Sequence, residues 1–260
     1  MSLIASVFNT PGHKALIAYI TVGYPDIDTT YKAASVLSEE GCDLIELGIP
    51  FSDPVADGVT IQKASYQALL KGITPQICLE VAERIRRNVA TPLAFMTYYN
   101  PVFNFGLEAF CQTSARAGID GLIVPDLPPE EGIELENTTR RLELDLIYLL
   151  APTSTDERIS LVTERARGFV YLVSVTGVTG ARQTLPAELE HFVRRVRQQT
   201  KLPLCVGFGI SGPEQARRVA AIADGVIVGS RLVQLIEEDA ALYSLKSFVQ
   251  SLRRALDANK

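Results

Sequence analysis

The sequence predicts a single α/β domain, a (β/α)8 or TIM barrel, that spans residues 1–260. Short runs of Ile, Leu and Val recur along the chain, and amphipathic helical stretches separate them. Strands this continuously apolar are typical of a parallel sheet that helices cover. Eight such units in 260 residues fit a barrel better than an open doubly wound sheet, and no Gly-x-Gly-x-x-Gly follows the first run.

The apolar runs give the expected strands, at residues 16–22, 43–49, 92–98, 121–125, 144–150, 169–175, 203–207 and 225–229. The expected helices include 28–40, 76–88, 107–117, 130–142, 155–165, 186–199 and 214–221. Three junctions from helix to strand resemble one another: EGCDLIE at 40–46, AGIDGLI at 117–123 and IADGVI at 222–227. Small residues end each helix there, with Gly as a left-handed cap, and an Asp precedes the strand. The echo supports one repeating unit.

Composition excludes several classes of protein. Hydrophobic residues make up 47% and charged residues 21%, which argues against disorder, and the net charge of -5 argues against a broad basic surface for nucleic acid. The widely spaced Cys42, Cys78, Cys111 and Cys205 suit reduced, buried thiols. No apolar run approaches the roughly 18 residues that span a bilayer, and the first residues do not resemble a signal peptide. We expect a cytoplasmic protein.

In a barrel, function lies where the strands end at their carboxyl side. After the seventh and eighth strands the chain reads GFGIS at 207–211 and GSR at 229–231. Glycines let backbone N–H groups approach an anion, and a helix start adds the positive end of its dipole. This pair of loops predicts a phosphate site. The alternative is that both are simple tight turns into helices.

Glu46 lies on the second strand, where alternation places it on one face with Leu44 and Gly48. A carboxylate among such apolar neighbours is costly to bury ionised, so its pKa should rise and suit proton transfer near neutral pH. The alternative is a structural Glu paired with an Arg.

The long loop after this strand carries Asp57, far enough along the chain to arch back over the barrel. Two carboxylates in different surroundings can hold different protonation states and so take different roles. The alternative for Asp57-Gly58 is turn chemistry before a helix at Thr60.

Two further strand exits carry weaker signals. The sixth, SVTGVTGAR at 174–182, has the glycines and hydroxyls of a mobile lid, and Tyr171 before it could face the barrel mouth or the core. The fourth carries Asp126 in a rigid, proline-rich loop that could serve as a docking surface; the alternative, which we favour, is that Asp126 only caps a helix.

Absent residue types exclude other chemistries. None of the lysines stands at a strand exit, which disfavours a Schiff-base aldolase or a pyridoxal enzyme. His13 and His191 have no partner at metal-ligand spacing, so no metal site is expected. The residues alone thus predict a metal-free barrel that binds a phosphate and performs acid–base chemistry with carboxylates.

The same residues carry a resemblance. ELGIPFSDPVADG at 46–58, followed by Thr60, Ile61 and Gln62, resembles the signature of the tryptophan synthase alpha chain family. YYNPVFN at 98–104, PDLP at 125–128, GVTG at 177–180 and GFGI at 207–210 match in the same order. The resemblance covers essentially the whole chain, and its first segment is highly specific.

The resemblance implies cleavage of indole-3-glycerol phosphate to indole and glyceraldehyde 3-phosphate, a retro-aldol step of tryptophan biosynthesis. By position, Glu46 would be the general acid and base at indole C3 and the glycerol hydroxyl. Asp57 would bind the indole N–H, and Thr179 would meet Asp57 when the lid closes. An indole ring protonated at C3 replaces an iminium as electron sink, which explains the missing lysine.

The resemblance also implies the remaining site residues. Phosphate would be held by Gly180, Gly209, Gly229 and Ser230. The indole pocket would be lined by Tyr19, Met96, Tyr98, Ile123, Tyr171, Thr179 and Phe208. Tyr19 and Met96 stand where the family often has Phe and Leu, which changes the shape of the pocket.

Family alpha chains dock on a pyridoxal phosphate-dependent beta chain, in an alpha2-beta2 heterotetramer, and need no cofactor of their own. The loop after the second strand and residues 100–104 and 125–129 would form the docking face. Three alternatives stay open: a free-standing indole-3-glycerol phosphate lyase, an isomerase or synthase for a ribulosylamine phosphate with Asp126 in its acid–base pair, and a non-catalytic barrel that activates a partner.

Overall fold

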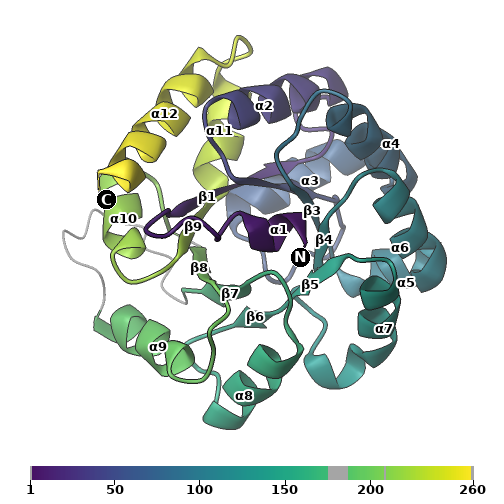
Figure 1. Cartoon of the computed structure of the whole chain (residues 1–260). Helices are drawn as coiled ribbons and strands as arrows, with labels where there is room; N and C mark the ends of the chain where they lie inside the picture. Colours follow the sequence, from purple (N-terminus) through teal and green to yellow (C-terminus); the bar gives the residue numbers. More distant parts are fainter. Residues whose placement is uncertain (1, 175–186, 208, 259–260) are drawn as a thin grey trace.

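The computed structural model describes residues 2–174, 187–207 and 209–258. Its strands form one sheet of parallel neighbours in the order β5-β4-β3-β2-β1-β9-β8-β7-β6, bent into a barrel with helices outside it (Figure 1). The strands are β1 Ala15–Thr21, β2 Leu44–Gly48, β3 Leu93–Met96, β4 Gly121–Ile123, β5 Asp145–Ile147, β6 Leu149–Leu150, β7 Val170–Val173, β8 Leu204–Gly207 and β9 Gly225–Val228.

The predicted eight-stranded barrel is confirmed. β5 and β6 are two parts of the single strand expected at 144–150, with Tyr148 between them. β5 pairs with β4 and β6 with β7, so this segment brings the two ends of the strand order together. The helix between consecutive strands makes each neighbour parallel, because a direct turn would reverse the chain.

The described helices and the helical turn surround the barrel, except for α1, which lies across the amino ends of the strands. They are α1 Leu3–Ser6, α2 Ile27–Glu39, α3 Val59–Leu70, α4 Pro75–Arg86, α5 Tyr99–Phe105, α6 Leu107–Arg116, η1 Pro129–Glu131, α7 Ile133–Arg141, α8 Asp156–Arg165, α9 Ala187–Arg197, α10 Pro213–Ala220, α11 Ser230–Glu238 and α12 Tyr243–Asp257. The seven predicted helices are confirmed within a few residues. The short α1 and α5 were not anticipated, since neither is long enough to show a helical period, and the longer α12, which follows the eighth strand–helix unit, was not anticipated either. None of the described helices is long and apolar enough to cross a membrane.

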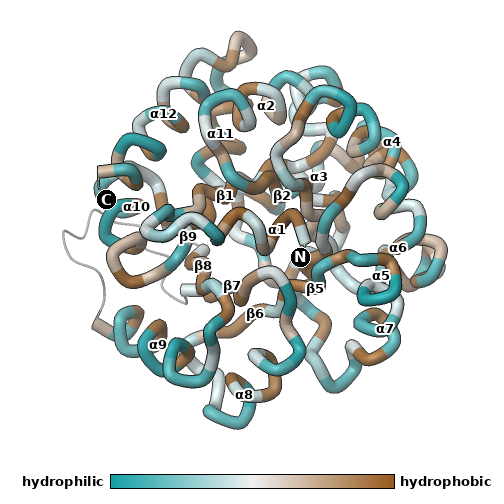
Figure 2. The backbone as a smooth tube through the Cα atoms, viewed as in Figure 1, coloured by the Kyte–Doolittle hydropathy of each residue, from teal (hydrophilic) through white to brown (hydrophobic). Residues whose placement is uncertain are grey.

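Two layers of side chains hold the barrel together. Every residue of β1 is buried, because helices cover one face of the strand and the barrel interior covers the other. Leu16, Ala18 and Ile20 join the outer cluster between sheet and helices. Ile17 and Tyr19 join the inner cluster. Figure 2 shows the apolar strands at the centre and polar residues on the outer faces of the helices.

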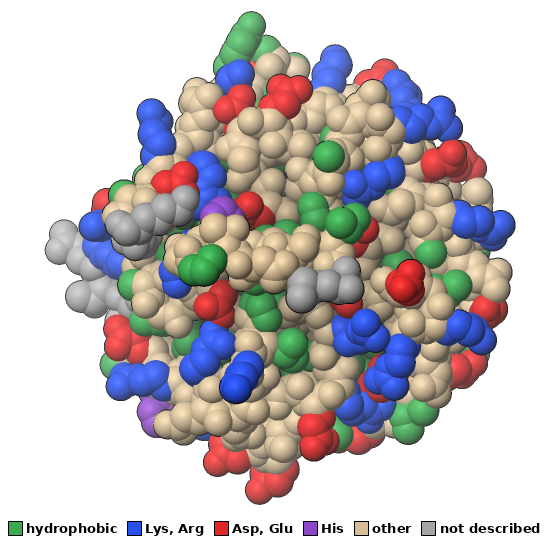
Figure 3. Space-filling model, viewed as in Figure 1, with side chains coloured by type: hydrophobic (Ala, Val, Ile, Leu, Met, Phe, Trp, Pro, Cys, Tyr) green, Lys and Arg blue, Asp and Glu red, His purple; other side chains and the backbone are tan. Residues whose placement is uncertain are grey.

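The amino ends of the strands are closed by α1 and by ion pairs. Ile4 of α1 is fully buried in the inner cluster, and α1 crosses the middle of the ring in Figure 1. Figure 3 shows acidic and basic side chains interspersed over this face.

The three repeated junctions share one device at this end. Each junction Asp accepts the backbone N–H of the first or second residue of a neighbouring strand, and each pairs with an arginine. The sets are Asp43 with Leu16 and Arg253, Asp120 with Leu93 and Arg86, and Asp224 with Leu204 and Arg197. Gly41 and Gly118 have φ values of 89° and 82°, so the expected left-handed caps are present at two of the junctions. The sequence echo therefore marks a repeated contact that ties strands to helices.

Candidate active site

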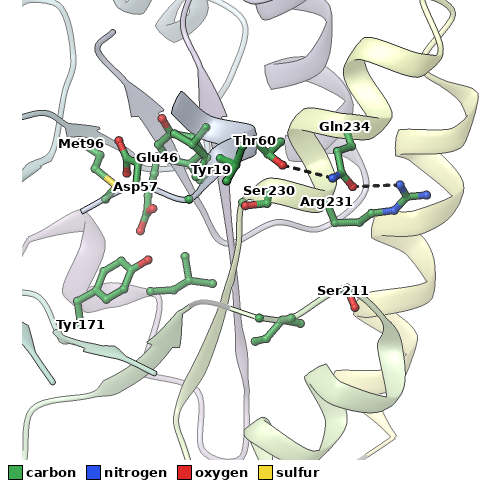
Figure 4. A pocket seen from close by; sticks show the side chains of 17 residues that line it. Tyr19, Glu46, Asp57, Thr60, Met96, Tyr171, Ser211, Ser230, Arg231 and Gln234 are labelled. Atoms are coloured by element: carbon green, nitrogen blue, oxygen red, sulfur yellow. Dashed lines mark hydrogen bonds between the residues drawn. The ribbon is translucent and has the colours of Figure 1, made fainter. Parts of the chain in front are cut away.

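A cavity of about 390 Å³ opens at the carboxyl ends of the strands (Figure 4). Its lining combines two carboxylates, apolar and aromatic walls, and a polar end rich in glycine and hydroxyl groups. The described lining residues are Tyr19, Glu46, Asp57, Gly58, Val59, Thr60, Ile61, Met96, Tyr171, Gly209, Ile210, Ser211, Ile227, Gly229, Ser230, Arg231 and Gln234. It is at the end of the barrel where function was expected.

Glu46 projects from the middle of β2 into the barrel. Its Cα partners are those of Tyr19 on β1 and Ala94 on β3, which fixes the predicted inward orientation. The residue is fully buried, and neither carboxylate oxygen has a hydrogen-bond partner among the described residues. Burial without a cation raises the pKa of Glu46 to about 8. No arginine pairs with Glu46 among the described residues, so the structure does not support the alternative of a structural Glu–Arg pair.

Asp57 reaches the same cavity from the loop between β2 and α3. Burial raises the pKa of Asp57 to about 6, and a hydrogen bond from the Tyr98 hydroxyl opposes the rise. That hydroxyl also accepts the N–H of Ala56 at 2.9 Å, so Tyr98 holds both the loop and the carboxylate. The Asp57 N–H donates to the carbonyl of Pro54 at 3.0 Å, which is the turn contact. Asp57 is therefore part of a turn and also lines the cavity, so the two interpretations of this residue are compatible.

The two carboxyl groups differ in protonation at neutral pH. With a pKa of about 8, Glu46 keeps its proton in most molecules, whereas Asp57, at about 6, is mostly ionised. A protonated carboxyl can donate a proton, and an ionised one can stabilise positive charge or accept a hydrogen bond. One cavity thus holds both a carboxylic acid and a carboxylate anion.

The walls beside these groups are apolar and closely packed. Tyr19 lies over Gly48, where an added Cβ would stand 2.1 Å from its hydroxyl oxygen, and Tyr171 lies over Gly207 in the same way at 2.4 Å. Side chains larger than hydrogen at these two strand ends would displace the tyrosines. Burial raises the pKa of Tyr19 and Tyr171 well above the usual range, so both hydroxyls stay protonated.

The other end of the cavity is suited to an anion. Gly209 has a φ of 82°, a conformation that favours glycine, and Ser211 follows it. Gly229 is the N-cap of α11, with no side chain capping the first turn, and Ser230 begins the helix. First-turn N–H groups and the positive end of the helix dipole attract negative charge. The two loops predicted to hold phosphate therefore meet in one place.

Some expected site residues lie elsewhere. Ile123 is fully buried in the inner cluster and does not line the cavity. Tyr98 lies behind Asp57 as its hydrogen-bond partner. Thr179, Gly180 and Phe208, with the lid expected around 177–181, lie outside the described residues.

Reasoning from the sequence missed part of the lining. Thr60 lies at the start of an expected helix and Ile210 in a loop quoted for its glycines, so neither was assigned to the lining. Arg231 was quoted without a role, and Gln234 follows it three residues later. A helical spacing from Ser230 would have found Gln234 one turn further along α11.

Residues set aside from the site behave as structural groups. Asp126 accepts the N–H of Tyr99 at 2.9 Å, so it caps the first residue of α5, a helix that the sequence did not predict. His13 bonds Asp43 at the amino end of the barrel. The four cysteines are free and buried. Within residues 2–174, 187–207 and 209–258, no three His, Cys, Asp or Glu side chains are grouped to hold a metal ion.

Known proteins share this sequence and architecture. The profile of the family described as "Tryptophan synthase alpha chain" matches residues 6–257. An alpha chain from Dehalococcoides mccartyi is 56% identical over 99% of this chain and 100% of its own, and one from Caldanaerobacter subterraneus is 49% identical over 94% and 95%. A tryptophan synthase structure from Mycobacterium tuberculosis has 40% identity and a TM-score of 0.92, covering 98% of both chains. An alpha chain structure from Legionella pneumophila has 35% identity and a TM-score of 0.88, covering 99% and 98%.

Proposed function

The chain belongs to the tryptophan synthase alpha chain family, and from this premise we propose how its own residues perform the family's reaction. It is a lyase that cleaves indole-3-glycerol phosphate to indole and glyceraldehyde 3-phosphate, the alpha reaction of tryptophan biosynthesis. The observation that carries the assignment of roles is the contrast between Glu46 and Asp57, two carboxyl groups of different pKa in one cavity.

In the first step Glu46 is the general acid. Its carboxyl proton moves to C3 of the indole ring, and the ring nitrogen acquires positive charge. The Asp57 carboxylate accepts the indole N–H and stabilises this charge, an interaction that is strong in a cavity with little water. The hydrogen bond from Tyr98 keeps Asp57 in place.

In the second step the Glu46 carboxylate is the general base. It takes the proton of the glycerol hydroxyl on the carbon attached to the ring, a C=O bond forms there, and the carbon–carbon bond to indole breaks. The electron pair of that bond returns to the ring and neutralises the nitrogen. Over one cycle a proton passes from oxygen to C3, and Glu46 ends protonated as it began. No Schiff base is required.

The two ends of the cavity divide the substrate. The indole ring packs against Tyr19, Met96 and Tyr171, with Thr179 and Phe208 added by family position, while Tyr98 acts on this pocket through Asp57. The phosphate binds to Gly209, Gly229 and Ser230, with Gly180 supplied by family position. Glycine at three of these positions leaves backbone N–H groups accessible to the phosphate oxygens.

The beta chain is the partner, and an alpha2-beta2 heterotetramer is the assembly we propose. Val55, Val59 and Phe103 are 84%, 83% and 65% exposed, and they lie in or beside the segments expected to dock. Large apolar side chains this exposed are typical of interaction surfaces. Pyridoxal phosphate would belong to the beta chain only. We propose that the whole chain acts as one barrel domain in the cytoplasm, where its four free thiols stay reduced.

The test is indole release from indole-3-glycerol phosphate by the purified chain, with and without a tryptophan synthase beta chain, across pH 5–9. We expect slow release alone, strong acceleration by the partner, and a rate that falls below pH about 6 and above pH about 8, as Asp57 gains and Glu46 loses a proton. Fast release that the partner leaves unchanged would identify a free-standing lyase. No indole under either condition would refute the assignment.

A further inference from the structure

Charge in the cavity presents a problem for a phosphate ligand. The described lining contains two carboxyl groups, on Glu46 and Asp57, and a single basic side chain, Arg231. A phosphate monoester carries between one and two negative charges near neutral pH. Backbone dipoles and hydroxyl groups at the polar end provide no full positive charge. Arg231 is therefore the described lining residue that can balance the ligand.

Arg231 stands at an unfavourable place for a cation unless an anion binds there. It is the second residue of α11, directly after Ser230 and next to the N-cap Gly229. The positive end of a helix dipole favours acidic residues in the first turn and disfavours basic ones. An anion at the same helix end reverses the preference. The position of this arginine thus points to a negatively charged ligand independently of the cavity.

The guanidinium group is held only loosely in the described arrangement. Its Nη1 lies 3.3 Å from Oε1 of Gln234, a contact drawn in Figure 4, and 3.7 Å from Oε2 of Glu238. Charge-assisted hydrogen bonds are usually about 2.7–2.9 Å long. The side chain is 35% exposed, so its surroundings leave room for another rotamer. Side chains in a helix lean toward its amino end, which brings the N-terminus of α11 within reach.

A second contact links this arginine to the acid–base end. Gln234 Nε2 donates to Oγ1 of Thr60 at 3.3 Å, and Thr60 is in the first turn of α3, three residues after Asp57. Movement of Arg231 off Gln234 would free the acceptor of that amide without breaking its bond to Thr60. The connection between α11 and α3 can therefore persist when the arginine turns.

We propose that Arg231 is a phosphate-binding and specificity-determining residue, which turns from Gln234 and Glu238 to the phosphate of the substrate at the N-terminus of α11. The inference rests on the proposed function and adds a cationic ligand to the backbone cradle of Gly209 and Gly229. Arginine offers several N–H donors in a planar fork that suits phosphate oxygens.

The test uses R231Q and R231K in the full chain, with R87Q as a matched control. Arg87 is 70% exposed and pairs with Glu83 on the outside of the barrel, so R87Q makes the same change of net charge far from the cavity. Glycerol 3-phosphate and indole are titrated separately at constant ionic strength, and KM and kcat for indole-3-glycerol phosphate are measured.

We expect R231Q to weaken glycerol 3-phosphate binding and raise KM by about 10- to 100-fold, the scale of a lost hydrogen bond to a charged group. Indole affinity should stay at the wild-type value and kcat should change less than KM. R231K should recover part of the phosphate affinity as a point charge, and R87Q should match wild type.

Two results would overturn the inference. One is unchanged glycerol 3-phosphate affinity in R231Q. The other is a parallel loss of indole affinity, which would mean that Arg231 only supports Gln234 and the wall of the cavity. Failure of the proposed function is a separate result, because it would appear as a wild-type chain that releases no indole.

Discussion

Two carboxylates on one segment of chain, three residues apart, have opposite surroundings. Asp43, just before β2, accepts hydrogen bonds from His13, Arg253 and the N–H of Leu16, at 2.8, 3.0 and 2.8 Å. Glu46, within β2, is fully buried with no partner among the described residues. The first ties strands and helices together at the amino end of the barrel. The second is costly to ionise and therefore keeps a proton at neutral pH. The carboxylate at the amino end of the barrel stabilises the fold, whereas the carboxyl group in the cavity is available for proton transfer.

Substitution of either carboxyl group in the cavity should have the greatest effect on catalysis. Glu46→Gln keeps the size of the side chain but removes the transferable proton, so we expect kcat for indole release to fall by about 10²- to 10⁴-fold. Asp57→Asn should fall by at least about 10²-fold, because the neutral amide no longer stabilises the positive ring nitrogen. Steady-state assays with saturating beta chain measure both. Activity within tenfold of wild type in either variant would remove that residue from its role.

Removal of the Asp43 carboxylate should lower the stability of the fold. Asp43→Ala leaves the Leu16 N–H and the Arg253 guanidinium without their shared acceptor, and we expect unfolding free energy to fall by about 2–3 kcal/mol. Urea denaturation measures the change. The rate of indole release per folded molecule should be unaltered, since Asp43 is at the opposite end of the barrel from the cavity. Asp43→Asn, which keeps one acceptor oxygen, should lose less. Equal stability of all three proteins would contradict the role of this contact.

The burial of Glu46 also predicts how the free energy of unfolding depends on pH. The ordinary pKa of Glu is 4.5 and burial raises that of Glu46 to about 8, so between these pH values the folded state holds a proton that the unfolded state has released. Stability of the wild type therefore falls as pH rises through this range, by about 1.4 kcal/mol per pH unit, and Gln does not titrate.

Glu46→Gln should accordingly match wild type near pH 5 and gain stability relative to it as the pH rises to 8. Asp57→Asn should show the same sign over a narrower range, because burial raises that pKa only from 3.8 to about 6. Urea midpoints measured at several pH values provide the test. A stability difference that is independent of pH would show that burial does not set the protonation of Glu46.

The smallest effect concerns an ion pair that belongs to neither end. Arg87 and Glu83 form a pair one turn apart at the end of α4, with side chains 70% and 57% exposed. Solvent screens such a pair, so Arg87→Gln should change unfolding free energy by no more than about 0.5 kcal/mol. A loss as large as that of Asp43→Ala would mean that exposure does not separate the two kinds of pair.

Local sequence patterns specify which segments form strands and on which face of its strand Glu46 lies. Alternation and apolar runs depend on residues a few positions apart, so periodicity reveals them without a structure. The glycines of the loops at 207–211 and 229–231 could also be interpreted from the sequence, because a left-handed or closely approached backbone requires glycine at that position. The repeated junction Asp was visible as a pattern, although its partners were not.

Contacts between residues far apart in the chain depend on how the whole barrel packs. Arg253 and Asp43 are 210 positions apart, and Gln234 and Thr60 are 174 apart, so no local pattern could pair them. The sequence predicted that the pKa of Glu46 is raised, but the size of the rise depends on desolvation by every element packed around β2. Burial and pairing are sums over neighbours that packing brings together, whereas strand and turn preferences are written in consecutive residues.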